Sequence, residues 1–394
     1  MTASHDVIVL GLGGMGTAAA AHLARRGLRV LGLDQHAPGH DRGASHGETR
    51  LIRKAYFESP RYVPLLHRAY ALWDELSEHA GAPLLHRSGL ALCTPAGAAE
   101  AGATTAFARA LATARALAVP VEELSAAQVR QRWPALALPD DMVCMFEPGA
   151  GFLEVDRCVA AHAVVARAHG AELRWQERVT AWSASARGVE VITDRGRHTA
   201  GRLVVTAGPW SAQVLSELAL PLRVHRVHQL WFAAGEAMAA ERGMPAYAFD
   251  VDGHFVYGFP RWGQWGAKIC EHAAGAEVAP DDPPDDPLDA VAGAAHDATA
   301  GALVPPAVAA AIAAYLPQVR PALVHAKRCL YTMTPDENFV IDLHPRHANV
   351  CLAAGFSGHG FKFASVVGEI LADLATAGTT AHPLDFLRLA RFAG

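Results

Sequence analysis

The sequence has few cysteines and lacks long apolar runs. Its six cysteines form neither a CxxC pair nor a zinc-ligand spacing, which argues against a disulfide framework and for a reducing compartment. No stretch reaches the roughly 18 consecutive apolar residues that a membrane span needs. The first ten residues have no basic start and are not typical of a secretory signal. We therefore expect a cytoplasmic protein without a membrane partner or a bound metal.

Charged residues are also scarce. They make up 19% of the chain, with a formal net charge of -5 and a pI near 6.5, so the composition is unlike that of a nucleic-acid-binding protein. The 51% hydrophobic content is typical of an ordinary globular protein. A chain of 394 residues is long enough for two domains, because single domains usually hold roughly 100–200 residues. We expect a small molecule, and no nucleic acid, as the partner.

A glycine-rich turn follows the first apolar run. Residues 6–10 (DVIVL) have the continuous apolar pattern of a buried parallel strand, and they lead directly into residues 11–16 (GLGGMG). The alanine-rich segment up to Arg26 predicts a helix that ends at Gly27. Residues 28–33 predict a second strand, which ends at Asp34. Together these segments predict a βαβ unit.

The βαβ unit predicts a dinucleotide site. Glycines let the backbone approach a pyrophosphate, which then lies at the positive end of the helix. The acid that follows the second strand would accept hydrogen bonds from a ribose. The predicted contacts are Gly11, Gly13, Gly14, Met15, Gly16 and Asp34. The motif by itself does not distinguish NAD from FAD.

The rest of the chain alternates between two kinds of pattern, which predict an α/β fold (α+β overall) with two domains. A Rossmann-like domain would comprise 1–85, 146–216 and 322–394. A second, mostly antiparallel-sheet substrate domain would comprise 86–145 and 217–321. The further predicted elements are helices over 60–80, 156–169 and 307–316, strands over 203–208, 255–260 and 266–270, and an exposed acidic loop over 280–287.

A polar loop over residues 45–53 (SHGETRLIR) carries two arginines three residues apart. Arg50 and Arg53 could share one face of a helical turn and present two positive charges to a site. The alternative is a solvated charged turn without a binding role.

A cysteine stands among basic and aromatic residues near the end of the chain. It is Cys329, in the block 329–332 (CLYT), and residues 355–362 (GFSGHGFK) follow about two dozen positions later. A core strand does not need this combination, which points to a flavin site. A cofactor with an adenosine end and a reactive ring end could bridge this region and the glycine turn. The alternative is that Cys329 is a buried apolar thiol, as most free cysteines are.

With these blocks in view, the chain resembles the family of monomeric sarcosine oxidase and N-methyltryptophan oxidase. These are flavoenzymes of the wider group that shares the D-amino-acid oxidase fold. The likeness extends over almost the whole chain. It rests on the glycine turn and on blocks 45–50 (SHGETR), 257–260 (YGFP), 329–332 (CLYT), 341–342 (ID) and 355–362 (GFSGHGFK).

The resemblance implies FAD held covalently through a thioether between Cys329 and the 8-methyl group of the flavin ring. By the same matching, His46 and Arg50 lie beside the flavin, where positive charge would favour the anionic reduced ring. The positions implied to contact the flavin are Ser45, His46, Thr49, Arg50, Cys329, Gly355, Gly358, His359, Gly360 and Lys362.

The resemblance also implies a substrate site. Arg53 and Lys362 match residues that bind the substrate carboxylate, a task that suits a planar guanidinium and an ammonium. Lys268 matches the lysine credited with oxygen activation, although a strand-end lysine commonly reaches water instead. The positions implied in catalysis are Lys268, His46, Arg50, Tyr257, His272 and Tyr331, of which Tyr257 and His272 also bind substrate.

Three segments depart from the family pattern. Glu48 stands where the family usually shows aspartate, and residues 262–265 (WGQW) and the acidic loop at 280–287 also differ. We expect the last two to border the pocket entrance. Trp262 and Trp265 hint at room for a bulky side chain or ring, although paired tryptophans more often pack a loop.

The implied activity is that of an oxidase of secondary amino acids, such as sarcosine or N-methyltryptophan, acting as a monomer. A hydride would pass to the flavin, the imine would hydrolyse to an amino acid and formaldehyde, and O2 would reoxidise the flavin to give hydrogen peroxide. Three alternatives stay open: oxidation of a cyclic imino acid such as pipecolate, a dehydrogenase that passes electrons to a carrier, and a flavoprotein that binds its ligand without turnover.

Overall fold

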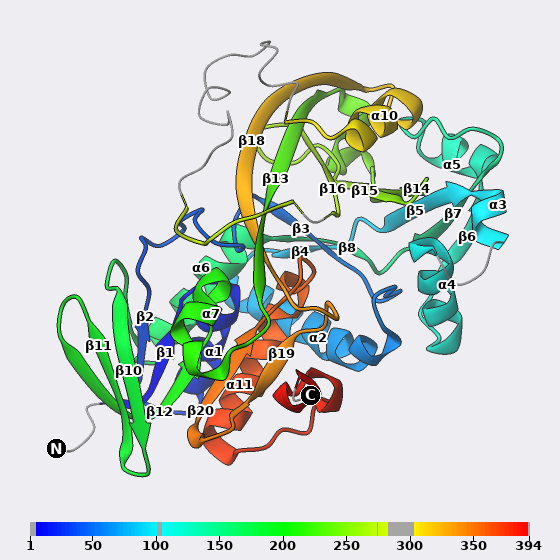
Figure 1. The fold of residues 1–394 in the computed structure, drawn as a ribbon. Helices are drawn as coiled ribbons and strands as arrows, with labels where there is room; N and C mark the ends of the chain where they lie inside the picture. Colours follow the sequence, from blue (N-terminus) through cyan, green and yellow to red (C-terminus); the bar gives the residue numbers. More distant parts are fainter. Residues whose placement is uncertain (1–4, 101–104, 274, 283–302, 393–394) are drawn as a thin grey trace.

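The computed structural model describes residues 5–100, 105–273, 275–282 and 303–392. Two bodies of secondary structure, lower and upper in Figure 1, are joined by the long strands β13 (Arg223–Ala234) and β18 (Val319–Met333). Of the acidic loop predicted at 280–287, residues 283–287 lie outside the described residues.

An eight-stranded sheet forms the lower body. Its central strands are buried runs of apolar residues, as expected for parallel strands that are covered by other layers. The strand order is β10-β11-β12-β1-β2-β9, with β20 beside β12 and β19 beside β20. The strands are β1 (His5–Leu10), β2 (Val30–Leu33), β9 (Glu172–Arg174), β10 (Val179–Ser185), β11 (Gly188–Thr193), β12 (Arg197–Val205), β19 (Val340–His344) and β20 (His347–Ala354).

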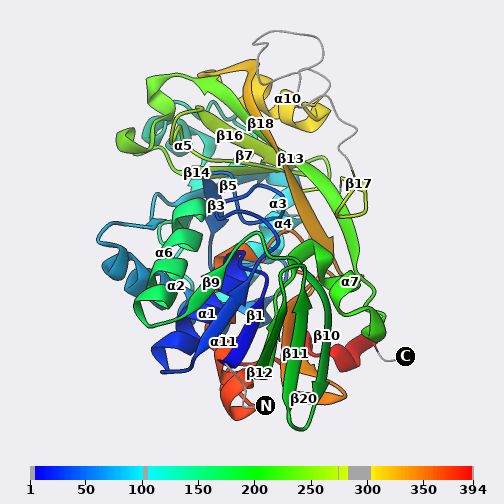
Figure 2. The same cartoon turned by 90° about the vertical axis from the view of Figure 1, so that its left-hand side faces the viewer.

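Four long helices gather beside this sheet (Figure 2). The central helix α1 packs against α6 and α11, and small residues let the backbones approach closely. A Cβ atom on Gly368 of α11 would lie only 2.6 Å from the carbonyl carbon of Ala18 in α1. The helices are α1 (Gly14–Arg25), α2 (Val63–Ala80), α6 (Val155–Ala168) and α11 (Ala364–Ala377).

A nine-stranded sheet forms the upper body (Figure 1), and its neighbours are antiparallel except for the parallel pair β14–β5. The strand order is β17-β13-β16-β15-β14-β5-β7-β6, with β18 beside β13. Besides β13 and β18, the strands are β5 (Leu90–Pro95), β6 (Glu122–Ser125), β7 (Met142–Glu147), β14 (Ala246–Val251), β15 (His254–Gly258), β16 (Ala267–Glu271) and β17 (Ala276–Glu277). Its helices are α3 (Ala96–Glu100), α4 (Ala106–Ala116), α5 (Ala126–Arg132) and α10 (Pro306–Tyr315).

Short helical turns connect these elements. They are α7 (Ser211–Val214), η1 (Pro60–Tyr62), η2 (Gly208–Trp210), η3 (Ser216–Leu218), η4 (Glu236–Met238), η5 (Ala240–Arg242), η6 (Phe361–Phe363), η7 (Asp385–Leu387) and η8 (Leu389–Phe392).

A small three-stranded sheet corrects one sequence prediction. It consists of β3 (Thr49–Ile52), β8 (Gly151–Glu154) and β4 (Leu85–His86). Arg50 therefore lies on a strand, and the helical turn that we predicted for Arg50 and Arg53 is wrong. The reason is long-range: β3 pairs with β8, a segment about 100 residues away, and such pairing overrides a local pattern.

The predicted fold class is confirmed, because a largely parallel α/β body stands beside a mostly antiparallel sheet. The predicted βαβ unit corresponds to β1, α1 and β2, and Gly27 follows the helix in a left-handed conformation. The division into domains stays a prediction. Strand β18 runs without a break through residue 322, where we had placed a boundary.

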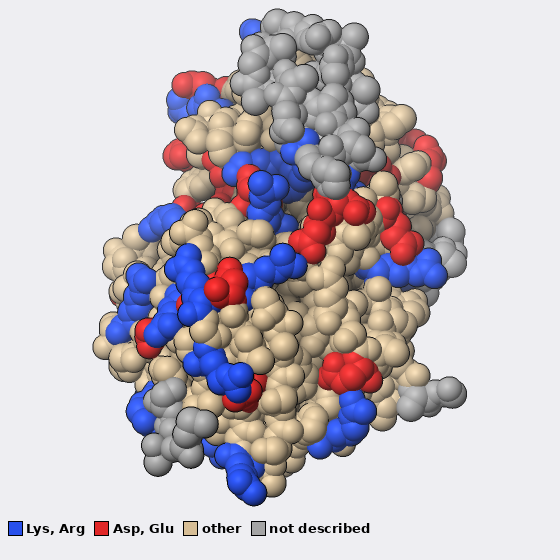
Figure 3. Space-filling view, turned by 60° about the vertical axis from the view of Figure 1, so that its left-hand side comes forward, with Lys and Arg blue, Asp and Glu red and all other residues tan. Residues whose placement is uncertain are grey.

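Acidic and basic side chains are interspersed on the face shown in Figure 3. A mixture of both signs keeps the surface potential modest, in contrast to the single-sign field of a nucleic-acid-binding face. Within the described residues, no helix is both long enough and apolar enough to cross a membrane.

Candidate functional site

One cavity of about 1280 Å³ draws its walls from both ends of the chain. It extends from the glycine turn after β1 to the loop after β20, and it includes part of β18. The predicted site residues in its walls are Gly11, Gly13, Gly14, Met15, Asp34, Ser45, Arg50, Arg53, Tyr257, His272, Cys329, Tyr331, Gly355, Gly358, His359, Gly360 and Lys362. Gly16, His46, Thr49 and Lys268 lie behind these walls.

The glycine turn brings bare backbone to the cavity. Gly11 has a φ of 88°, and a Cβ atom there would lie 2.3 Å from the carbonyl oxygen of Thr206. A Cβ atom on Gly16 would lie 1.7 Å from the carbonyl oxygen of Gly11, so this glycine permits helix and strand to pack together. Helix α1 has no acid in its first turn and no cap from its own N-cap residue Gly13. The Ser45 hydroxyl accepts a hydrogen bond from the Gly14 amide, and the positive end of the helix faces the cavity.

Asp34 supports the same turn. One carboxylate oxygen accepts a hydrogen bond from the Leu12 amide at 2.8 Å, and the other accepts one from the His36 amide at 2.9 Å. Each oxygen keeps a further lone pair for a ligand hydroxyl. The predicted ribose acceptor is thus also a brace for the turn.

Cys329 and Arg50 meet at the other end of the cavity. The Cys329 side chain is buried but lies in the cavity wall. The Arg50 guanidinium is 3.7 Å from its sulfur and also donates to the side chain of Gln229 at 3.1 Å. Gln229 comes from β13, so three separate strands fix this corner.

His46 and Lys268 lie just behind that corner. Burial, followed by the charges of Arg50, Lys327 and Lys268, lowers the pKa of His46 to about 3. The imidazole is therefore neutral, and the positive charge that we expected from it has to come from Arg50. Lys268 is 2% exposed and donates to the carbonyl oxygens of Gly47 and Thr49, both at 2.8 Å.

Arg53 is occupied by a carboxylate of the protein itself. Its guanidinium donates to both oxygens of Glu58, at 2.9 and 2.8 Å, and to the carbonyl oxygen of Ala55 at 2.9 Å. Burial would raise the pKa of Glu58, but the charges of Arg53 and Lys362, together with the hydrogen bonds from Arg53, outweigh it and hold that pKa at about 2. A substrate carboxylate would have to share Arg53 with Glu58 or displace it.

Lys362 lies near the same aromatic ring as Arg53, that of Tyr56. Its ammonium is 5.1 Å from the Tyr56 ring centroid, while the Arg53 guanidinium is 4.6 Å from it. The ammonium donates to the carbonyl oxygen of His359 at 2.7 Å. Burial lowers the pKa of Lys362 to about 7, although the charge of Glu58 opposes this shift. Two cationic groups of the cavity wall thus lie near one buried aromatic ring.

Tyr257, His272 and Tyr331 line the same part of the cavity. Burial raises the pKa of both tyrosines and lowers that of His272, so all three side chains are neutral near pH 7. Beyond them lies a second cavity of about 790 Å³. The two cavities share Phe57, Glu58, Phe255, His272 and Tyr331.

We expected Trp262 and Trp265 to border the pocket entrance, but neither lines the two cavities. Trp262 packs against His86 and Phe152, and Trp265 stacks on His325 with ring centroids 3.9 Å apart. Both lie outside the walls of the two cavities. In the described part of the acidic loop, Asp281 accepts a hydrogen bond from Trp210, a residue of the main cavity wall.

A family model described as FAD dependent oxidoreductase matches residues 6–374. The chain belongs to this FAD-dependent oxidoreductase family. The monomeric sarcosine oxidase of Streptomyces avermitilis is 39% identical over 400 residues, which cover 100% of this chain and 99% of that protein. The N-methyl-L-tryptophan oxidase of Salmonella dublin is 35% identical over 394 residues, covering 99% of both. The resemblance inferred from the sequence blocks is confirmed.

Solved structures agree with this assignment. NikD, described as an unusual amino acid oxidase essential for nikkomycin biosynthesis, is similar with a TM-score of 0.78 and 27% identity over 98% of both chains. Glycine oxidase from Geobacillus kaustophilus gives a TM-score of 0.79 at 22% identity over 99% of both chains. The second likeness shows the fold alone.

The residues of this FAD-dependent oxidoreductase fit an extended dinucleotide. The cavity is long enough to reach from the glycine turn to Cys329, because both line it. At the phosphate end, Gly14 donates its amide to Ser45 at 3.0 Å, and a Cβ atom on it would lie 2.9 Å from the Phe361 ring. Backbone amides at the start of α1 would hold the pyrophosphate, and Arg50 and Cys329 would face the ring end.

Sequence reasoning missed three residues that organise the site. Glu58 pairs with Arg53, the Tyr56 ring lies close to both Arg53 and Lys362, and Gln229 accepts a hydrogen bond from Arg50. Glu58 had a weak local signal, since an acid five residues after a buried arginine is a ready partner. Gln229 had none, because it is 179 positions away from Arg50 in the sequence.

The lowered pKa of Lys362 predicts how carboxylate binding depends on pH. Only the ammonium form attracts a carboxylate, so affinity is present below the pKa of about 7 and is lost as the pH rises above it. Methoxyacetate, which is sarcosine with an ether oxygen in place of the amine, isolates this effect because it has no titrating nitrogen.

We expect its Kd, measured by the change in flavin absorbance, to increase between pH 6 and 9. The Lys362→Met variant should bind weakly with a much flatter profile. A flat profile for the unchanged protein would contradict the assignment.

Proposed function

We propose that the protein is an oxidase of secondary amino acids, with an N-methyl amino acid as substrate. The observation that carries this proposal is the pair of buried cations, Arg53 and Lys362, which lie close to the same Tyr56 ring and line the cavity that Cys329 also lines. Buried positive charge favours an anionic ligand, and a carboxylate matches both groups. The names of the sarcosine and N-methyltryptophan oxidases that this chain is similar to support the same substrate class.

Bound FAD would accept a hydride from the carbon next to the substrate amine and pass the electrons to O2, giving hydrogen peroxide. Arg53 and Lys362 would fix the carboxylate, which places that carbon in one position. Tyr257, Tyr331 and His272 would enclose it with neutral groups. These neutral walls would favour the uncharged amine, whose free lone pair the reaction needs. The imine product would hydrolyse to an amino acid and formaldehyde.

The second cavity bears on the size of the substrate. It adjoins the main cavity at Phe57, Glu58, Phe255, His272 and Tyr331, next to the Arg53–Glu58 pair, so a substrate held by Arg53 would have this space beside it. Its volume of about 790 Å³ leaves room for a large side chain. We therefore favour a bulky N-methyl amino acid over sarcosine, on the basis of this cavity and not of Trp262 and Trp265.

The substrate class can be tested with acids and their methyl esters. We expect N-methyltryptophan to reduce the flavin without oxygen and to yield one peroxide per turnover in air. Pipecolate would test whether a cyclic imino acid is oxidised, and sarcosine would test whether a small N-methyl amino acid reacts as well as a bulky one. Each methyl ester should react at least roughly tenfold less efficiently, because hydrogen bonds to a charged group contribute about 1.5–3 kcal/mol. Equal turnover of ester and acid would rule out the carboxylate clamp. Flavin reduction without peroxide would indicate a dehydrogenase.

We further propose that Cys329 carries the FAD through a thioether. Its sulfur lies in the cavity wall at 3.7 Å from the Arg50 guanidinium, at the end of the cavity opposite the glycine turn, where the ring end of FAD would lie. After acid precipitation, the yellow colour should stay in the pellet. The Cys329→Ser variant should release it to the supernatant, whereas Cys351→Ser, at a buried cysteine on β20 outside the cavity wall, should not. Free flavin from the unchanged protein would refute attachment.

Lys268 is proposed to assist the reaction with oxygen. Burial and the charge of Arg50 lower the pKa of Lys268 to about 7, so a substantial fraction stays charged at neutral pH. A buried ammonium can stabilise negative charge as it develops on oxygen.

We expect Lys268→Met to slow reoxidation of the reduced enzyme by roughly 10²-fold or more, the scale for loss of one preorganised charge, and to slow reduction much less. Lys327→Met is the matched control, because Lys327 lies nearby against Trp265. Stopped-flow measurement of both half-reactions decides the matter, and equal slowing of the two would reject the role.

A cytoplasmic monomer is the proposed form of the enzyme. All six cysteines are free thiols, which suits a reducing compartment. Size-exclusion chromatography with light scattering tests the oligomeric state, and a dimer mass would overturn that part of the proposal.

A further inference from the structure

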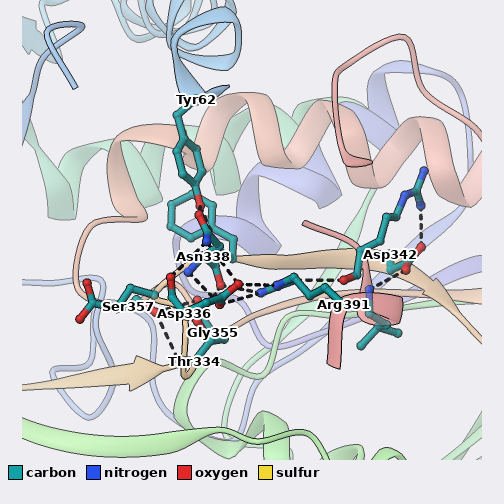
Figure 4. Close-up of polar contacts among 12 residues, drawn as sticks. Tyr62, Thr334, Asp336, Asn338, Asp342, Gly355, Ser357 and Arg391 are labelled. Carbon is teal, nitrogen blue, oxygen red and sulfur yellow. Dashed lines mark hydrogen bonds and ion pairs between the residues drawn. The ribbon is translucent and has the colours of Figure 1, made fainter. Parts of the chain in front are cut away.

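The turn between β18 and β19 is held from the outside by the C-terminal segment (Figure 4). Arg391 in η8 donates through Nε to Asp336 at 2.9 Å and through Nη2 to the carbonyl oxygen of Asn338 at 2.8 Å. Asp336 also accepts from the backbone amide of Asn338 at 3.2 Å. One guanidinium thus contacts both a side chain and the backbone of the turn.

The same turn holds the loop at residues 355–360 from the inside (Figure 4). The Thr334 amide donates to the Ser357 hydroxyl oxygen at 3.2 Å, and the Ser357 amide donates to the carbonyl oxygen of Thr332 at 2.9 Å. The His359 ring nitrogen Nε2 is 3.0 Å from the carbonyl oxygen of Glu337. The turn therefore stands between Arg391 and a loop that lines the main cavity.

These contacts assign the tautomer of His359. A carbonyl oxygen only accepts hydrogen bonds, so Nε2 carries the proton. Nδ1 is then an acceptor for the Tyr56 hydroxyl, at 2.6 Å. The carbonyl oxygen of His359 accepts from the Lys362 ammonium at 2.7 Å. Through these contacts of His359, the turn helps to fix the positions of Tyr56 and Lys362.

Backbone strain shows that the loop depends on its surroundings. Ser357 has a φ of 45° and Glu337 one of 58°, a left-handed region that non-glycine residues rarely occupy. Such residues persist where neighbouring contacts determine their conformation. Ser357 is buried and held at both its amide and its hydroxyl group, while Glu337 lies in the turn that Arg391 braces.

The C-terminal segment is itself firmly attached. Arg388 donates to Asp342 of β19 at 2.5 Å, and the amide of Leu389 donates to the same carboxylate at 2.9 Å. Phe386 packs on the ring of Tyr62 with centroids 4.9 Å apart. A segment anchored at these points can serve as a fixed support for Arg391.

We propose that Arg391 is a positioning residue that holds the cavity loop at 355–360, and through it His359 and Lys362, from outside the cavity. The effect on substrate binding rests on the proposed function of Lys362. The effect on the loop and on the flavin does not, because the loop lines the cavity of an FAD-dependent protein whatever its substrate.

The test compares Arg391→Ala, Arg391→Lys and Arg26→Ala in the complete FAD-loaded protein. Arg26 is a matched control, since it forms a similar partly exposed ion pair with Asp373 at 2.6 Å, between α1 and α11. The measurements are hydrogen exchange in peptides covering 355–360, the flavin midpoint potential, the Kd of methoxyacetate and the unfolding temperature.

We expect Arg391→Ala to speed exchange in the loop and to shift the potential to more negative values, because the ammonium near the cavity is no longer held in place. The Kd should rise roughly fivefold, comparable with the strain of about one left-handed residue. Arg391→Lys should recover part of each effect, since an ammonium can still pair with Asp336. Arg26→Ala should lower the unfolding temperature by a similar amount while leaving loop exchange, potential and Kd close to their original values.

The proposal would be overturned if Arg391→Ala left the hydrogen exchange of the loop and the flavin potential as they are in the unchanged protein. It would also be overturned if Arg26→Ala changed both quantities as much as Arg391→Ala does. If the unchanged protein binds no carboxylate, the proposed function of Lys362 fails. Loop exchange and potential then still decide the role of Arg391.

Discussion

The burial of positive charge around one cavity is the constraint on which the site depends. Lys268, Arg53 and Lys362 are 2%, 3% and 6% exposed. A buried cation is costly unless it is paired or hydrogen-bonded. Glu58 provides a direct carboxylate for Arg53, whereas Lys268 and Lys362 donate to backbone carbonyl oxygens. Carbonyl dipoles compensate an ammonium only in part, which explains why both lysines lose much of their basicity.

Because negative charge is scarce around the cavity, the site favours an anionic ligand. An anionic ligand in the cavity that Arg53 and Lys362 line would offset charge that the protein leaves under-compensated. In the absence of a ligand, Glu58 balances part of that charge through its ion pair with Arg53. A ligand carboxylate would compete with Glu58 for the Arg53 guanidinium.

The fold supplies these groups from distant parts of the chain. Arg50 and Arg53 come from β3 and the residues after it, Lys268 from β16, and Lys362 from η6 beyond β20. The three-stranded sheet with β3 lies where the two larger bodies meet, as seen in Figure 1. Small movements between these elements would therefore change the distances between the cations. For this reason, contacts outside the cavity, such as those of the C-terminal segment, matter for the geometry of the site.

The sequence by itself determined the βαβ unit and the glycine turn, because a strand, a tight turn and a helix follow one another within 30 residues. The fold class followed from the alternating patterns, and the family from short blocks spread along the chain. It also indicated Cys329, Arg53 and Lys362 through short blocks. Only the tertiary structure decided the charge and surroundings of these groups. It placed Arg50 on a strand, kept His46 neutral, set Lys268 behind the cavity wall and paired Arg53 with Glu58. Burial and long-range pairing govern those properties, and neither is encoded in neighbouring residues.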